Sequence, residues 1–291
     1  MKNYVEENER ILKEWCESYV KENQPYYPNC TNLGDYFAKD GIMYMGDIVA
    51  DPKVYPNGEK TFRWKRVESG CENELWEKEP LRILYLTKDQ NTGDDVAWDV
   101  RSESFRYADE NYKPKEMWLD TTVTFFRNLV YSLYCIGNTT VEKPVIDFTN
   151  KEALEYADKH IFARINCKKE VGGSTCSNAV LKGAIDHDSI YLKQQIDNLE
   201  ADVFICCGYS KSIEKTGSHI LNFLNDSGYH FVPVIDDWIY YDETKNKVAI
   251  NSWHLSDFSR FDYSEMALKY HDFLKSHPKF IENIMISRQK Q

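Results

Sequence analysis

The chain has 291 residues, of which 42% are hydrophobic and 14% aromatic, enough to bury the core of one large α/β domain or two small ones. A net charge of −11 excludes a surface coated with basic residues, although it is compatible with a local basic cleft. No run approaches the roughly 18 apolar residues of a membrane span, and the first ten residues lack the apolar centre of a signal peptide. We therefore expect a cytoplasmic protein.

The eight cysteines form no Cys-x-x-Cys pair, and Cys206 and Cys207 are adjacent within an apolar run. This spacing favours reduced, mostly buried thiols over disulfides or a metal site. No metal and no other cofactor is expected.

An amphipathic helix is predicted over residues 1–20, where apolar residues recur at helical spacing: Val5, Ile11, Leu12, Trp15 and Tyr19. Residues 23–79 are rich in Tyr, Pro, Asn and Gly, with short candidate strands at 42–45 and 61–67. We interpret residues 1–79 as an N-terminal extension packed on the core, and residues 80–291 as the main α/β domain.

The stretch 81–86 is apolar except for Arg82; it is too short for a helix and is typical of a strand buried on both faces, as in a parallel sheet. Polar residues from Thr87 to Asn91 follow it directly, and they include the carboxylate of Asp89. Ligands of open parallel sheets bind beyond the carboxyl ends of the strands, so Asp89 is a candidate catalytic residue.

Strands and helices alternate through the rest of the chain. Further strands are predicted at 161–166, 202–207 and 247–252, a strand or hairpin at 231–241, and helices at 116–136, 152–160, 190–199, 213–224 and 264–274. The expected fold is a three-layer α/β sandwich around a mostly parallel four-stranded sheet. Asn166 and His254 follow two of these strands, which places them beside Asp89 in one crevice.

In these three segments the chain resembles the uracil-DNA glycosylase superfamily, over about residues 80–262. Leu84-Tyr-Leu-Thr-Lys-Asp89 is similar to the strand and loop that bear the catalytic Asp, Phe162-Ala-Arg-Ile-Asn166 to the strand ending in a base-reading Asn, and His254-Leu-Ser-Asp-Phe-Ser to the His-Pro-Ser-Pro-Leu-Ser loop. The chain departs from the pattern at Gln90-Asn91, where the family has Pro-Tyr, and it lacks the four cysteines of the iron–sulfur branches.

The resemblance implies a role for each residue. Asp89 would stabilise positive charge on the sugar and orient water, and His254 would donate a hydrogen bond to the departing base, worth roughly 3–4 kcal/mol. Asn166 would read a pyrimidine edge, with Trp98 or Phe105 as the stacking platform for a flipped base.

DNA contacts are expected from two loops. Phe258 is either a wedge that fills the space left by the flipped base or a buried core residue. Gly172, Gly173 and Ser174 form either a phosphate-binding turn or a plain surface turn. Positive charge and polar contacts near these loops would come from Lys168, Lys169, Ser256 and Arg260.

The sequence thus predicts a monomeric, monofunctional DNA glycosylase without a cofactor. The small Asn91, together with the donors and acceptors of Gln90 and Thr92, favours a 5-substituted pyrimidine such as the hydroxymethylated or glucosylated cytosine of some phage genomes, in anti-phage defence. The alternative base is uracil, in base-excision repair. Two rivals are a catalytically silent nucleic-acid-binding protein on the same fold, and an enzyme that hydrolyses small nucleosides or nucleotides.

Overall fold

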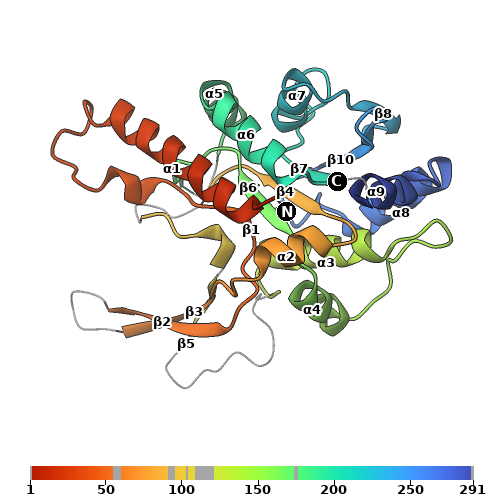
Figure 1. Ribbon diagram of the computed structural model, residues 1–291, viewed down its shortest axis with the longest axis horizontal. Coiled ribbons are helices and arrows are strands. Elements are labelled where there is room, and N and C mark those ends of the chain that lie inside the picture. Colours follow the sequence, from red (N-terminus) through yellow and green to blue (C-terminus); the bar gives the residue numbers. More distant parts are fainter. Residues whose placement is uncertain are drawn as a thin grey trace.

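A seven-stranded mixed sheet forms the centre of the protein (Figure 1). The computed structural model describes residues 2–54, 60–90, 96–102, 104–108, 121–173 and 176–289, with the backbone alone at 51–54, 60–64 and 104–108. The strand order is β1 (Gly41–Ile42), β6 (Ala163–Asn166), β4 (Ile83–Thr87), β7 (Val203–Cys207), β10 (Lys247–Ser252), β9 (Ile239–Asp242) and β8 (Val232–Ile235).

The four strands β6, β4, β7 and β10 are parallel, as the sequence predicts, and they bring their carboxyl ends to one edge. The predicted sheet size is too small, because β1, β9 and β8 extend it with antiparallel pairings. Every residue of β4 is buried, which explains its unbroken apolar sequence. The segment 231–241 forms the β8–β9 hairpin.

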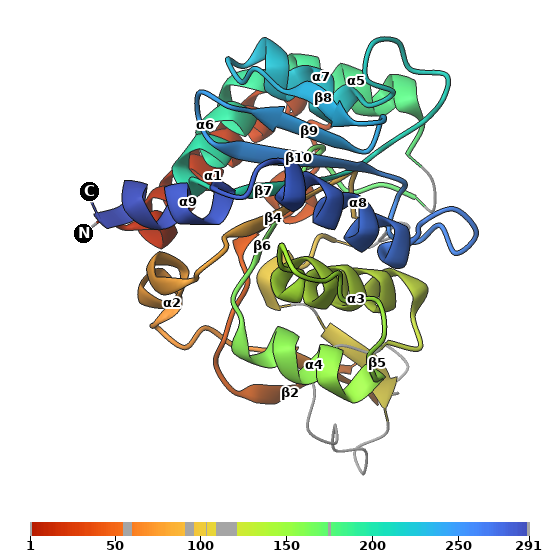
Figure 2. The same ribbon diagram turned by 90° about the vertical axis from the view of Figure 1, so that its right-hand side faces the viewer.

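Helices cover both faces of this sheet (Figure 2). One face packs against α3 (Thr124–Asn138), α4 (Asn150–Lys159), α8 (Tyr263–Ser276) and α9 (Phe280–Gln289). The other face packs against α1 (Tyr4–Asn23), α5 (Asn178–His187), α6 (Ser189–Leu199) and α7 (His219–Asp226), together with Trp76 of α2 (Glu72–Lys78). The three-layer α/β arrangement is therefore confirmed, while α2, α5 and α9 are helices that the sequence patterns did not reveal.

The N-terminal segment is part of these layers. Helix α1 packs against α6, where the rings of Trp15 and Tyr191 stack with centroids 5.7 Å apart, and β1 is the edge strand of the main sheet. Two short 3₁₀ helices, η1 (Leu33–Tyr36) and η2 (Val100–Ser102), lie in the connections. A second, antiparallel sheet has the order β2 (Ile48–Val54), β3 (Lys60–Arg66), β5 (Ser104–Ala108). No helix in the described ranges is long and apolar enough to cross a membrane.

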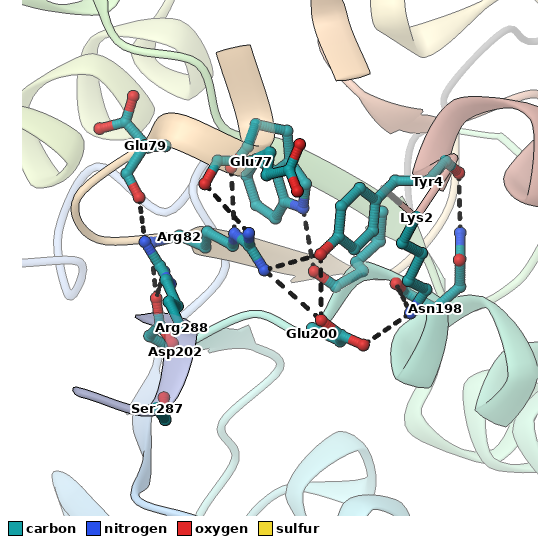
Figure 3. A network of polar contacts seen from close by, with 12 residues as sticks. Lys2, Tyr4, Glu77, Glu79, Arg82, Asn198, Glu200, Asp202, Ser287 and Arg288 are labelled. Atoms are coloured by element: carbon teal, nitrogen blue, oxygen red, sulfur yellow. Dashed lines mark hydrogen bonds and ion pairs between the residues drawn. The ribbon is translucent and has the colours of Figure 1, made fainter. Parts of the chain in front are cut away.

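A polar network fastens the opposite edge, at the amino ends of β4 and β7 (Figure 3). The buried Arg82 donates to the hydroxyl of Tyr4 at 3.2 Å and lies 3.6 Å from the carboxylate of Glu200. Arg288 of α9 pairs with Asp202, whose carboxylate also accepts from the backbone N–H of Arg82 at 2.9 Å. The network joins α1, α9 and the amino ends of the strands, and none of its residues lies at the carboxyl ends.

Candidate active site

A cavity of about 730 Å³ opens at the carboxyl ends of the parallel strands. Its wall contains Lys88, Asp89, Gln90, Trp98, Val123, Phe125, Phe126, Arg164, Gly173, Cys176, His254, Ser256, Asp257, Phe258, Ser259 and Arg260. A hollow of similar size between α5 and α7 contains no residue from the ends of these strands. The cavity therefore lies at the position where open α/β sheets usually bind their ligands.

Asp89, two residues beyond β4, lies in this wall with its side chain only 10% exposed. Burial raises the pKa of its carboxyl, and the nearby cations of Lys168 and Lys88 only partly oppose that shift. The Nζ atom of Lys168 is 3.9 Å from Oδ2 of Asp89. The result is a poorly solvated carboxylate, which interacts more strongly with developing positive charge than one in water would.

His254 enters the same cavity from the loop after β10. Burial, with the nearby cations of Lys88 and Arg164, lowers its pKa to about 4, so the imidazole is neutral at neutral pH. The backbone N–H of Ser256 donates to Nδ1 of His254 at 3.3 Å, and the Ser256 hydroxyl lies 2.6 Å from the same atom. Because Nδ1 accepts, the ring hydrogen is on Nε2, which makes His254 a neutral hydrogen-bond donor.

Asn166 ends β6 and is fully buried, so it does not itself line the cavity. The hydroxyl of Thr87 donates to its Oδ1 at 2.6 Å, and its Nδ2 has no hydrogen-bond partner within the described structure. An unsatisfied buried donor costs about 1–3 kcal/mol, so a bound acceptor could recover that free energy. The predicted base-reading residue is present, but one layer below the cavity wall.

Arg164, two residues before Asn166, is a cavity residue that the sequence analysis missed. It is 5% exposed, its Nε donates to the Thr87 hydroxyl at 3.4 Å, and its guanidinium lies 4.4 Å from the ring centroid of Phe125. A charged residue within an otherwise apolar strand was the available signal. With Lys88 and Arg260 it gives the wall three cations against the carboxylates of Asp89 and Asp257.

Two predicted DNA contacts are corrected by burial. Lys169 is 1% exposed, and its Nζ lies 2.6 Å from both carboxylate oxygens of Asp40, which also accepts the backbone N–H of Asn166 at 2.8 Å. Lys168 is 9% exposed and donates to the carbonyl of Glu170 at 2.6 Å. Both ammonium groups are therefore used by partners within the protein: Asp40 holds that of Lys169, and that of Lys168 lies between Glu170 and Asp89.

The predicted phosphate-binding turn instead packs against the catalytic candidate. A Cβ added to Gly172 would lie 2.4 Å from Oδ2 of Asp89, so only glycine admits the carboxylate at this distance. The backbone N–H of Gly172 is used by the carbonyl of Gln90 at 2.9 Å. A carboxylate so close would repel a phosphate, and the prediction for Gly172 is wrong. Gly173 lines the cavity, and Ser174 lies outside the described residues.

The predicted base pocket is only partly described. Trp98 lines the cavity, while Asn91 and Thr92 lie outside the described residues, as does the side chain of Phe105, whose backbone belongs to β5. Gln90 donates through Nε2 to the carbonyl of Trp98 at 2.6 Å and accepts its N–H at 3.2 Å. Both polar atoms of the Gln90 amide are therefore bonded to the Trp98 backbone. This corrects the expectation that the Gln90 amide would contact the base.

The loop after His254 forms the rim. Phe258 is 81% exposed, which excludes the alternative that it is a core residue. Arg260 bonds the carboxylate of Asp257 through Nε at 2.7 Å and lies 4.1 Å from the ring centroid of Trp253. Ser256 is exposed in this loop and bonds Nδ1 of His254, as described above, and its contact with DNA stays a prediction. An exposed aromatic ring thus stands at the cavity mouth beside a cation.

The wall therefore holds a desolvated carboxylate, a neutral imidazole donor and three cations. Such a set can stabilise opposite charges that separate across a breaking bond. Within the described residues no three His, Cys, Asp or Glu side chains gather as metal ligands would. No family model matches the chain, and no curated protein matches its sequence.

Proposed function

We propose that the protein is a DNA glycosylase that hydrolyses the bond between a pyrimidine and its deoxyribose. One observation carries this function: the buried carboxylate of Asp89 and the neutral imidazole of His254 line the same cavity at the carboxyl edge of the sheet. The resemblance of the three strand ends to the uracil-DNA glycosylase superfamily supports the same function.

The reaction breaks the bond from C1′ to the base nitrogen, and the base departs with the electron pair. Asp89 would stabilise the positive charge that develops on the sugar and orient a water molecule, whose oxygen bonds to C1′. His254 would donate Nε2–H to a carbonyl oxygen of the departing base, where negative charge accumulates. The water loses one proton and the base anion gains one from solvent, which leaves a free base and an abasic sugar.

Recognition would use the remaining features of the wall. The ring of Phe125 or Trp98 would stack on the flipped base, and the exposed Phe258 would occupy the gap in the duplex. The cations of Lys88 and Arg164 would favour a substrate that carries or develops negative charge. These contacts suit a nucleotide drawn from DNA better than a free nucleoside, which needs no wedge.

For the base itself we propose a 5-substituted pyrimidine, such as a hydroxymethylated or glucosylated cytosine of phage DNA, with defence as the biological role. This choice rests on the sequence difference at Asn91, where the resembling loop carries a Tyr that blocks the carbon-5 side. A pocket without that wall rejects an added group only weakly.

The test uses duplexes that contain uracil, 5-hydroxymethylcytosine or glucosylated 5-hydroxymethylcytosine, with free nucleosides in parallel. Abasic sites are revealed by alkali cleavage, and the Asp89→Asn variant is the control for contaminating activity. Release of the bulky bases supports the full proposal, while release of uracil alone overturns the open pocket and indicates repair. Release from nucleosides but not from DNA identifies a nucleoside hydrolase, and no release from any substrate rejects the enzyme.

A further inference from the structure

The small antiparallel sheet is strongly basic in a chain that is acidic as a whole. Strands β2, β3 and β5 together contain a single acidic residue, Asp51. They contain six cationic residues: Lys53, Lys60, Arg63, Lys65, Arg66 and Arg106. The rest of the molecule must therefore be even more acidic than the net charge of −11.

The pairing register sorts most of these residues onto two faces, because directly opposed residues of antiparallel strands share a face. On one face, which we call the basic face, Thr61 opposes Lys53, Arg63 opposes Asp51, and Lys65 opposes Val49 and Ser104. On the other face, Phe62 opposes Pro52 and Ala108, and Trp64 opposes Ala50 and Phe105. The basic face thus carries three cations and the carboxylate of Asp51, whereas the other face is mainly apolar and carries Lys60, opposite Val54, and Arg66.

Described side chains at the base of the sheet show which face meets the body of the protein. Arg66 is on the apolar face and only 6% exposed; its Nε donates to the carbonyl of Gly46 at 3.1 Å, and its guanidinium pairs with Asp158 of α4. Ile48, opposite Arg66, packs against the core. Lys65, on the basic face, is half-buried. The basic face is therefore the one turned away from α4.

The chain connects this sheet to the cavity on both sides of β5. Trp98 lines the cavity, and Ser104 begins β5 six residues later, a span of at most about 20 Å. The next described residues after β5 lead into Val123 and Phe125, which also line the cavity. In Figure 1 the small sheet projects from the body below β1, the edge strand of the main sheet. A turn of duplex DNA is about 34 Å long, so one turn can reach from the cavity to the sheet.

We infer that the basic face binds the phosphate backbone of the duplex whose target nucleotide enters the cavity. Because most of the surface repels DNA, a concentrated cluster of cations would supply the attraction and also fix the orientation of the duplex. This assignment rests on the proposed function, since it takes DNA as the partner. Under this assignment, strands β2 and β3 of the N-terminal extension would hold the DNA backbone, which the residues at the strand ends do not do.

The test compares two double variants of equal charge change. Lys53→Glu with Arg63→Glu alters the basic face, while Lys13→Glu with Lys21→Glu alters the exposed side of α1. Affinity for an unmodified duplex is measured by fluorescence anisotropy over a range of salt concentrations, and thermal unfolding checks the fold. If the glutamates disturb the sheet, Lys53→Gln with Arg63→Gln removes the charge without reversing it.

The basic-face variant should bind at least tenfold more weakly, with the slope of log affinity against log salt smaller by about 2, near 0.9 for each lost phosphate contact. The α1 variant should change affinity less than threefold. Equal losses in both variants, no loss in either, or no measurable binding by the unaltered protein would overturn the assignment. Binding through the basic face without base release from any substrate would retain it while rejecting the glycosylase, so the two failures can be told apart.

Discussion

Thr87 and Asn166 are opposite each other at the last paired position of β4 and β6, and the Thr87 hydroxyl donates a 2.6 Å hydrogen bond to Oδ1 of Asn166. Arg164 donates to the same hydroxyl at 3.4 Å, which directs its hydrogen toward Asn166. This relay leaves Nδ2 of Asn166 as the free end of the amide. In the structure described here this donor is buried below the cavity wall, so the proposed contact with a base requires the wall to open toward Nδ2.

Replacing Thr87 by Val should leave Oδ1 of Asn166 buried and unpaired and release the amide to turn over. We expect a loss of about 1–3 kcal/mol in unfolding free energy and at least a tenfold loss in kcat/KM. Thr87→Ser keeps the hydroxyl and should retain both properties. Denaturant unfolding and base-release kinetics measure the two effects. A Val variant as active as the Ser variant would show that the hydrogen bond from Thr87 to Asn166 is not needed for substrate recognition.

Asp89→Asn should abolish base release, leave DNA affinity nearly intact and raise Tm at pH 7. Burial raises the pKa of Asp89, so the folded state favours the protonated carboxyl and the ionised form weakens folding at neutral pH. The neutral amide removes that cost. The gain in Tm should vanish as pH falls below about 3.9, the pKa of an unfolded aspartate. Calorimetry across pH checks the sign, and a variant that is less stable at pH 7 would contradict it.

Protonation of His254 should cause no loss of base release between neutral pH and pH 5, because its pKa is about 4, so a loss in that range is assigned to Asp89, whose pKa is raised by burial. Its pKa when unfolded is near 6.5, so its contribution to stability is full above pH 6.5 and declines as pH falls toward 4. His254→Ala should lower the rate about a hundredfold, on the scale of one lost oxyanion donor. His254→Gln keeps a neutral donor and should lose less. A rate that falls with a midpoint near 6.5 would mean that the imidazole is not desolvated.

Gly172→Ala should lower the rate at least tenfold, because a Cβ there would lie 2.4 Å from Oδ2 of Asp89 and displace the carboxylate. A shift of about 1 Å in a catalytic group is enough for a loss of this size. Gly173→Ala is the matched control, since its Cβ would meet no atom within 4 Å in the described structure. Both variants should unfold at similar temperatures. Equal activity in the two would show that the position of Asp89 does not depend on this contact.

Phe258→Ala should leave Tm unchanged, because the side chain is 81% exposed, and should lower base release from duplex DNA about tenfold. Release from single-stranded DNA should be unaffected, since no base stack has to be held open. Ile190→Ala, at a position 70% exposed on α6, is the control for the loss of an exposed apolar side chain. Equal losses on both kinds of DNA would argue that Phe258 contacts the base and is not a wedge.

The sequence predicted the parallel strands well. The central strands β4 and β7 are buried on both faces, so they appear in the sequence as short apolar runs without the alternation of a half-exposed strand. It predicted a short strand at 42–45, which overlaps β1 only at Ile42, because β1 has two residues and becomes a strand only by pairing with β6. It placed Asp89 and His254 correctly at the cavity, since strand ends determine that position. Lys169 was misassigned because a buried and an exposed lysine look alike until the partner is known.

Asp40 and Lys169, joined by that buried ion pair, are 129 residues apart in the sequence. At typical rates of translation roughly ten seconds pass between their synthesis. During that interval the apolar side of α1 has no α6 to cover it, and β1 has no β6 to join. Until β6 and α6 are made, the apolar side chains of α1 therefore remain exposed on the ribosome, where a chaperone could bind them. A chain arrested before β6 would expose Ile11, Leu12 and Trp15 and would be prone to aggregate.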